Sequence, residues 1–167
     1  DWSSDVCSSD LDQLTSINAR LRLMTGSAEA AAAAQEEIYQ AAMRSRGAYA
    51  DMADFVSQLG TVAGNSFTGT DELVAFAEQI QKQMAISGAS GASAQAALVQ
   101  LTQGLASGTL RGEELNSVLE QTPMIAQTIA EYMGVTTGEM RELASEGKVT
   151  AEVVKNAMLG AAEETNA

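Results

Sequence analysis

Three pairs of adjacent glutamates come closest, by residue type, to acid–base chemistry in this sequence. They are Glu36 and Glu37, Glu113 and Glu114, and Glu163 and Glu164. A general acid and a general base that act on one bond must flank it, so their side chains have to converge. Neighbouring residues of an α-helix instead diverge by about 100°. The pairs therefore indicate exposed helix faces rather than a hydrolytic centre.

Nucleophiles and metal ligands are scarce in the chain. Histidine is absent and Cys7 is the only cysteine, which excludes Ser/His/Asp triads, Cys/His pairs and Cys/His zinc sites. The run SGASGAS at 87–93 lacks the lysine and Ser/Thr that follow a phosphate-binding loop, so we interpret it as a flexible linker. We predict no catalytic residue, no metal and no cofactor, and therefore no enzyme.

Composition predicts an all-α fold and a protein partner. The 167 residues contain one proline and 4% aromatic residues, which favours helices over sheets. Nine Lys and Arg against 22 Asp and Glu give a net charge of -13, which repels nucleic acid and anionic lipid. No apolar run approaches the roughly 18 residues that span a bilayer. We therefore expect no nucleic acid and no membrane contact by this segment.

Apolar residues at helical spacing predict a series of short and medium helices. The first spans 11–24, and an alanine-rich second spans 28–46, with Ser27 as its cap and Ile38, Ala42 and Met43 on one side. Alanine buries little area, so these helices suit either close helix packing or an extended arm.

Threonines and glycines mark the predicted helix ends. Hydroxyl caps are expected at Thr70, Thr122, Thr136 and Thr150, with Pro123 at the first helical position after Thr122. The glycines expected to interrupt helices are Gly26, Gly47, Gly60 to Gly69, Gly88 to Gly91, Gly108, Gly134 and Gly147. The tight spacing in the last third predicts a compact helical knot of roughly 50 residues that resembles a helix-turn-helix.

The sequence divides into three parts. Residues 1–11, DWSSDVCSSDL, resemble the translation of a common sequencing adapter and are expected to carry no function. Residues 12–46 are predicted to form an N-terminal extended helical arm, and residues 47–167 a multi-helix domain that ends in the knot. We expect the chain to be a fragment of a longer protein.

A helix-turn-helix DNA-binding regulator is the alternative reading of the knot. The charges of the knot argue against this interpretation, because residues 111–167 contain four basic residues and ten glutamates. The candidate recognition helix carries Glu139, Glu142 and Glu146 against the single Arg141, whereas DNA readers need several phosphate contacts.

One family resemblance covers most of the chain after the adapter. The stretches LRGEELNSVLEQTP at 110–123, GVT at 134–136 and EGKVT at 146–150 resemble the tape measure domain of bacteriophage tail tape measure proteins. The similarity extends upstream to ISGAS at 86–90 and LVQLTQGLASG at 98–108. The motif residues, which we expect to be structural, are Leu110, Arg111, Gly112, Glu113, Glu114, Glu120, Pro123, Gly134 and Gly147.

The resemblance implies a structural part of a phage or prophage tail. Tape measure proteins form a helical rod around which tail-tube subunits polymerise, and the rod sets tail length. The implied partners are tail tube, tail tip or tail assembly chaperone proteins, with possible self-association. The implied location is the lumen of the virion tail tube, and the host cytoplasm during assembly.

The glycine interruptions indicate a folded domain near one end of the rod rather than its shaft. We expect this domain to dock on a tail component through an acidic or methionine-lined face. Met124, Met133 and Met140 are the candidate contacts, because methionine adapts to varied surfaces. The alternative is that all three are core residues.

Overall fold

The computed structural model describes the backbone of residues 2–46, 48–88 and 91–165, and the side chains of residues 11–46, 48–88 and 91–162. Within these residues the chain forms helices and no sheet, which confirms the all-α class. The elements are α1 (Trp2–Thr25), α2 (Ala28–Ser45), α3 (Tyr49–Ala63), the 3₁₀ turn η1 (Gly64–Ser66), α4 (Thr70–Ser87), α5 (Gly91–Ser107), α6 (Gly112–Gln121), α7 (Pro123–Met133), α8 (Thr137–Ser145) and α9 (Ala151–Thr165).

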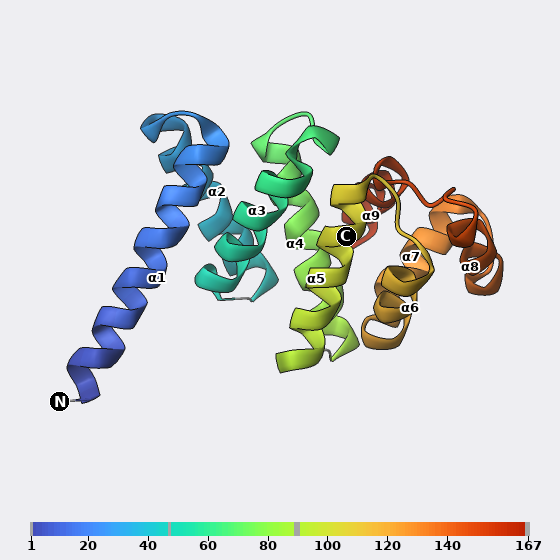
Figure 1. Ribbon diagram of the computed structural model, residues 1–167, viewed down its shortest axis with the longest axis horizontal. Coiled ribbons are helices and arrows are strands. Elements are labelled where there is room, and N and C mark those ends of the chain that lie inside the picture. The colour runs from blue at the N-terminus through green and yellow to red at the C-terminus, as the bar shows by residue number, and fades with distance from the viewer. Residues whose placement is uncertain (1, 47, 89–90, 166–167) are drawn as a thin grey trace.

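The first five helices run alternately up and down (Figure 1). α1 and α2 form one helical hairpin and α3 and α4 a second, with α1 beside α3 and α2 beside α4. α5 packs on the other side of α3. As a result α1, α3 and α5 point the same way and form one row of helices.

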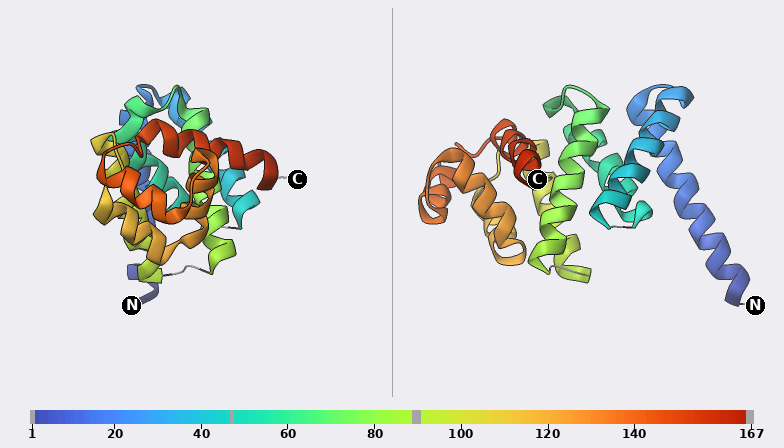
Figure 2. Two further views of the ribbon diagram at one scale, coloured as in Figure 1. Left: turned by 90° about the vertical axis from the view of Figure 1, so that its right-hand side faces the viewer. Right: turned by 180° about the vertical axis from the view of Figure 1, so that it is seen from behind.

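The last four helices form the predicted compact knot at the opposite end from the start of α1 (Figure 1). α6 packs on α5, α7 and α8, while α9 turns back to contact α4 and α7. Figure 2 shows α9 lying across the up-and-down helices. A single apolar cluster runs from Ile17 in α1 to Met158 in α9, so the knot and the hairpins share one core.

The first two helices pack closely against the rest of the chain. Ile17 and Leu21 of α1, and Ala34 and Ile38 of α2, are buried in the shared core. The alanine-rich sequence of α2 thus allows close helix packing, because small side chains bring neighbouring backbones together. Only the beginning of α1 extends past its neighbours (Figure 1), and Leu11 there is 64% exposed.

Several predicted helix ends are confirmed. The Ser27 hydroxyl accepts the Ala30 backbone N–H at the start of α2. Thr136 and Glu139 form a complete capping box at the start of α8. The Thr150 hydroxyl accepts the Val153 N–H at the start of α9. Gly134 stops α7 in the left-handed conformation, with φ of 70°.

One predicted threonine cap is wrong, and a second occupies its predicted N-cap position without making the capping hydrogen bond. Thr70 is the first residue of α4 rather than its cap, and Thr68 instead bonds the Glu72 carboxylate in the first turn. Thr122 precedes Pro123 as expected, but its hydroxyl donates to the Val118 carbonyl of the preceding helix, at 3.0 Å. The physical reason is that a threonine hydroxyl can equally serve the end of one helix or the start of the next.

Three further expectations need correction. Gly60 lies inside α3 instead of ending it. A glycine is needed there because Met24 of α1 occupies the space that a side chain at position 60 would fill. Met43 points outward and is 63% exposed, since Ala41 and Ala42 face the core. The linker predicted at 87–93 is shorter, because α4 ends at Ser87 and α5 begins at Gly91. Residues 47 and 89–90, where other interruptions were expected, lie outside the described residues.

Candidate functional site

The knot is closed by backbone hydrogen bonds between two distant turns. The Leu110 N–H donates to the Val149 carbonyl at 2.7 Å, and the Ala151 N–H donates to the Gly108 carbonyl at 2.9 Å. The two bonds form an isolated antiparallel bridge between Thr109 and Thr150. The turn that precedes α6 is thereby fastened to the turn that precedes α9.

Leu110 fixes the bridge to the core. Its side chain is 1% exposed and lies directly over Gly104 of α5. A Cβ atom on Gly104 would come within 2.5 Å of Leu110 Cδ1. α5 and the α5–α6 turn can therefore approach this closely only because position 104 has no side chain.

The bridge brings together some of the predicted motif residues and leaves others apart. Leu110, Arg111 and Gly112 lie at the turn that pairs with the segment after Gly147. Glu113 and Glu114 occupy the first turn of α6, where the helix dipole favours negative charge. Glu120, Pro123 and Gly134 lie along α6 and α7, away from the bridge. Glu120 lies near the end of α6, Pro123 begins α7 and Gly134 ends it.

The three candidate docking methionines lie at different depths. Met140 is fully buried in the core, so it presents no contact surface in this structure. Met124 and Met133, on α7, are partly exposed, and Met133 packs against the core. Tyr132, beside Met133, is 53% exposed. Nine positions, or about 2.5 helical turns, separate Met124 from Met133, so their side chains lie on opposite sides of α7 and do not form one surface.

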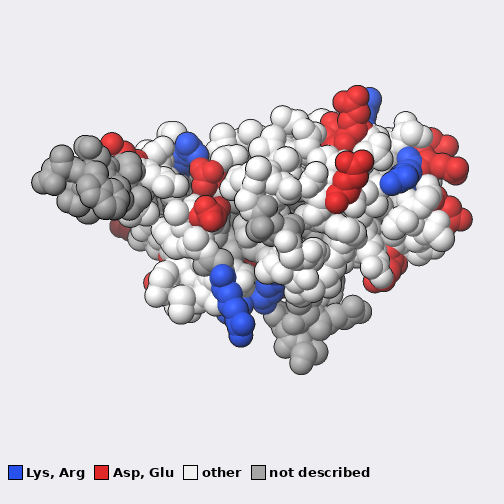
Figure 3. Space-filling view, turned by 90° about the horizontal axis from the view of Figure 1, so that it is seen from below, with Lys and Arg blue, Asp and Glu red and all other residues white. Residues whose placement is uncertain are grey.

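The charges of α8 do not suit DNA. Hydrogen bonds from the Thr136 backbone N–H and hydroxyl lower the pKa of Glu139, so this carboxylate is ionised at neutral pH. Lys148 pairs with Glu146 at 2.5 Å. On the face shown in Figure 3, basic side chains are scattered among acidic ones rather than gathered into a continuous surface. A phosphate backbone would find little attraction there.

A groove lies on the row formed by α1, α3 and α5. Its main hollow, of about 700 Å³, is lined by eight residues. These are Arg20, Leu23, Met24, Gln58, Gly60, Thr61, Val62 and Thr102. A smaller hollow of about 160 Å³ shares Gln58 and Thr102 with it and reaches Val99 of α5. Both hollows therefore belong to one surface that crosses three helices.

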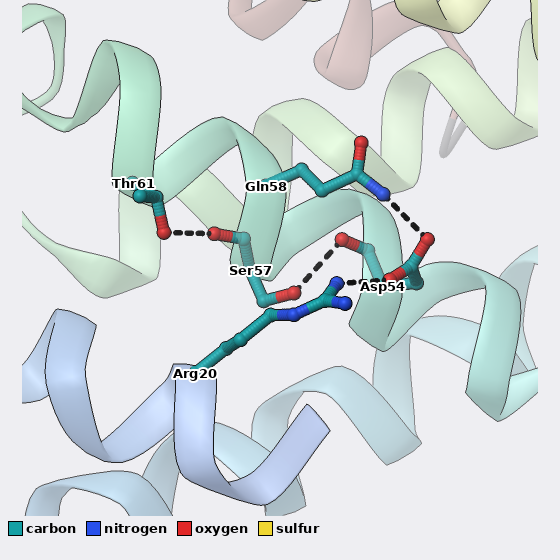
Figure 4. Close-up of polar contacts among 5 residues, drawn as sticks. All are labelled: Arg20, Asp54, Ser57, Gln58 and Thr61. Atoms are coloured by element: carbon teal, nitrogen blue, oxygen red, sulfur yellow. Dashed lines mark hydrogen bonds and ion pairs between the residues drawn. The ribbon is translucent and has the colours of Figure 1, made fainter. Parts of the chain in front are cut away.

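An ion pair holds the helices that form the groove (Figure 4). Arg20 of α1 donates to Asp54 Oδ1 of α3 at 2.6 Å, and Gln58 donates to Asp54 Oδ2 at 2.6 Å. Both carboxylate oxygens of Asp54 are thus engaged. Ser57 and Thr61 instead donate to backbone carbonyls of their own helix, at 2.9 Å and 2.7 Å.

A carboxylate pair between α2 and α4 was not predicted. Burial, a hydrogen bond with Asp71 and the negative charge of Asp71 all raise the pKa of Glu37. The pairs of adjacent glutamates in the sequence do not indicate this contact, because Glu37 and Asp71 meet only after α2 packs on α4. Among the described residues, no three His, Cys, Asp or Glu side chains are grouped closely enough to hold a metal ion.

The polar contacts around α4 were likewise not predicted. Glu78 of α4 is buried and accepts two hydrogen bonds from the Arg44 guanidinium of α2, at 2.9 and 2.8 Å. It also pairs with Lys82 at 2.8 Å. Glu72 pairs with Lys155 of α9 at 2.8 Å. These contacts place Glu72, Glu78 and Lys82 of α4 in structural roles.

In the described part of the chain, no helix is long and apolar enough to span a membrane.

The comparisons with known proteins give one match. The family model described as tape measure protein matches residues 9–167, which is almost the whole chain. Neither the curated proteins nor the solved structures contain a significant match.

Proposed function

Because the chain belongs to the tape measure protein family and is thus a structural component of a phage tail, we propose that it acts in tail assembly and tail-length determination by docking to other tail proteins. The single observation that carries this proposal is the family match over residues 9–167. The fold supports it, because a bridged knot and stacked hairpins form a folded unit rather than a continuous shaft.

The proposed partners are tail tube, tail tip or tail assembly chaperone proteins, with self-association as a further form of docking. The proposed location is the lumen of the tail tube, after assembly in the host cytoplasm. Three parts are proposed: residues 1–11 without function, an arm over residues 12–46 that packs along the rest of the chain through the shared core, and a domain over residues 47–167. The motif residues are proposed to maintain the knot, since Leu110 and Gly112 flank its bridge.

Met124 and Met133, near the two ends of α7 and on opposite sides of it, are the proposed contacts of the knot. Met124 and Met133 can be changed without emptying the centre of the core, whereas Met140 cannot. The test is co-expression of this chain with each tail protein of the same phage, followed by affinity purification. We expect the double variant Met124→Ala, Met133→Ala to recover less partner and to melt between the unchanged protein and Met140→Ala, because Met133 packs against the core only partly buried.

Met140→Ala is the matched control for a core role. Truncating a buried methionine costs about 2–5 kcal/mol of unfolding free energy, so this variant is expected to melt earlier. If the α7 double variant recovers each tail protein at the unchanged level, the α7 contact is wrong. If no tail protein co-purifies with the unchanged chain either, docking itself is wrong.

A further inference from the structure

The groove on α1, α3 and α5 carries three exposed aliphatic side chains, one from each helix. Leu23 of α1 is 85% exposed, Val62 of α3 is 51% exposed and Val99 of α5 is 46% exposed. Leu23 and Val62 line the main hollow, and Val99 lines the adjoining one. Isolated exposed aliphatics are ordinary on protein surfaces, but a set of three along one groove is typical of an interface.

The floor of the groove can adapt to an incoming side chain. Met24 lies against Gly60, and its flexible thioether forms part of the lining. Methionine at such a position can change rotamer at low cost and so fit different shapes. Exposed Gln58 and Thr61 stand beside the apolar residues, and Thr102 is buried below them. Apolar residues with polar neighbours are usual in protein interfaces.

The backbone around the groove restricts the form of the occupant. The lining residues belong to α1, α3 and α5, whose backbone N–H and C=O groups are used within the helices. The groove therefore offers no free strand edge to which an extended peptide could add. A segment that enters it must satisfy its own backbone hydrogen bonds, which favours an α-helix.

Charge selects among helical partners. Asp51 is exposed at the smaller hollow, and Arg20 is already neutralised by Asp54. The whole chain has a net charge of -13, so a basic segment would be attracted to it more strongly than an acidic one. Exposed Asp51 and this net charge therefore complement a helix that carries Lys or Arg beside its apolar stripe.

We propose that the groove over α1, α3 and α5 binds a basic amphipathic helix of a partner protein. Its aliphatic side chains contact Leu23, Val62 and Val99, and its Lys or Arg side chains lie near Asp51. This inference rests on the proposed function, because it names the surface and the partner chemistry of the docking. It concerns a surface other than α7, so the two contacts can be tested separately.

The first test uses a fluorescent synthetic helix of leucine and lysine at amphipathic spacing, titrated with the full 167-residue chain. The groove variant is Leu23→Gln, Val62→Gln, and the matched control is Met43→Gln, Ile86→Gln, which changes two exposed apolar residues outside the groove. We expect the groove variant to raise the dissociation constant at least about tenfold and the control less than about twofold. The same peptide with glutamate in place of lysine is expected not to bind.

Two results of this titration would overturn the proposal. Equal weakening by the groove and control variants would show diffuse attraction to an acidic surface. Equal binding of the glutamate peptide would remove the role of charge. A circular dichroism melt of each variant checks that the substitutions leave the fold intact, which is expected because the changed side chains are exposed.

The second test identifies the occupant in cells that produce the phage. A photo-crosslinking amino acid replaces Val62, and the crosslinked peptide is identified by mass spectrometry. A crosslink to a basic amphipathic helix of a tail protein is the expected result. Crosslinks only to an acidic segment, to a second copy of the chain, or to nothing would contradict the groove assignment. If tail proteins still co-purify with the chain in that case, the proposed function stands without it.

Discussion

At the scale of single residues, the least expected conformation is that of Arg46. It follows α2 in the left-handed region, with φ of 56°, whereas the other described residues with positive φ are glycines. Its backbone N–H donates to the carbonyls of Ala42 and Met43 and so closes the helix. A glycine usually occupies this position, because a side chain there is strained.

Arg46→Gly is expected to stabilise the protein. Relief of left-handed strain is worth about 1–2 kcal/mol, and the greater freedom of glycine in the unfolded chain offsets up to about 1 kcal/mol. Urea denaturation followed by circular dichroism measures the difference. Arg46→Ala, which keeps the strain and removes the side chain, is expected to gain nothing. A gain in that control would locate the effect in the arginine side chain instead.

Glu78 predicts a pH dependence of stability. Burial raises the pKa of its carboxyl, but the hydrogen bonds from Arg44 and Lys82 outweigh burial, so the pKa of Glu78 lies below its ordinary 4.5. A depressed pKa in the folded state contributes stability above pH 4.5, and that contribution disappears as pH falls through the folded value. Glu78→Gln is therefore expected to destabilise the protein by about 2 kcal/mol at pH 7, since hydrogen bonds to charged groups contribute about 1.5–3 kcal/mol.

The unchanged protein and Glu78→Gln are then compared below pH 4.5, where the difference between their unfolding free energies should shrink. Glu142→Gln, on the exposed side of α8, is the control and should change stability by less than about 0.5 kcal/mol at either pH. A difference between the Glu78 proteins that stays constant with pH would mean that packing, rather than charge, makes Glu78 important.

At the scale of helices, the sequence predicted most of the elements, because local signals decide them. Gly134, Thr136 and Glu139 act within one turn of chain, so their spacing alone indicates a stop followed by a capping box. The place of Gly60 and the hydrogen-bond partner of the Thr122 hydroxyl were misinterpreted, because both depend on neighbours that spacing does not show. Gly60 receives Met24 from another helix, and Thr122 bonds backward into α6.

Two glycine substitutions separate packing from helix propensity. Gly160→Ala, on the exposed side of α9 with open space around it, is expected to stabilise the protein by about 0.5–1 kcal/mol. Gly104→Ala gains the same propensity but collides with Leu110, and overpacking costs about 1–3 kcal/mol. It should therefore destabilise the protein. Unfolding free energies that change in the same direction for both variants would show that the Leu110 turn can move away.

At the scale of the whole molecule, the sequence indicated a helical protein with a compact end but not its groove. The groove depends on α1, α3 and α5 lying in one row, and the residues that create it are far apart in sequence. Arg20 meets Asp54, and Leu23 approaches Val62, only after the hairpins stack. No alternation or cap in the sequence encodes which helices become neighbours.

Removal of residues 1–11, the segment expected to carry no function, tests whether it contributes to the fold. Residues 11–16 are exposed, and Ile17 is the first buried residue among the described side chains. The family match also begins only at residue 9. The shortened chain should keep its unfolding free energy within about 0.5 kcal/mol, as surface changes usually do. A loss of more than about 1 kcal/mol would show that the segment contributes to the fold.

The bridge between Thr109 and Thr150 also determines how the molecule responds to mechanical tension. When the chain is pulled from its two ends, force passes between Gly108 and Ala151 through their hydrogen bond and through the packing of α9 on α4. The roughly 40 residues between them bear no load until that contact opens, and then lengthen the chain by up to about 140 Å. A single-molecule force–extension trace should therefore contain one release of this size. Its absence would mean that α6 to α8 yield before the bridge does.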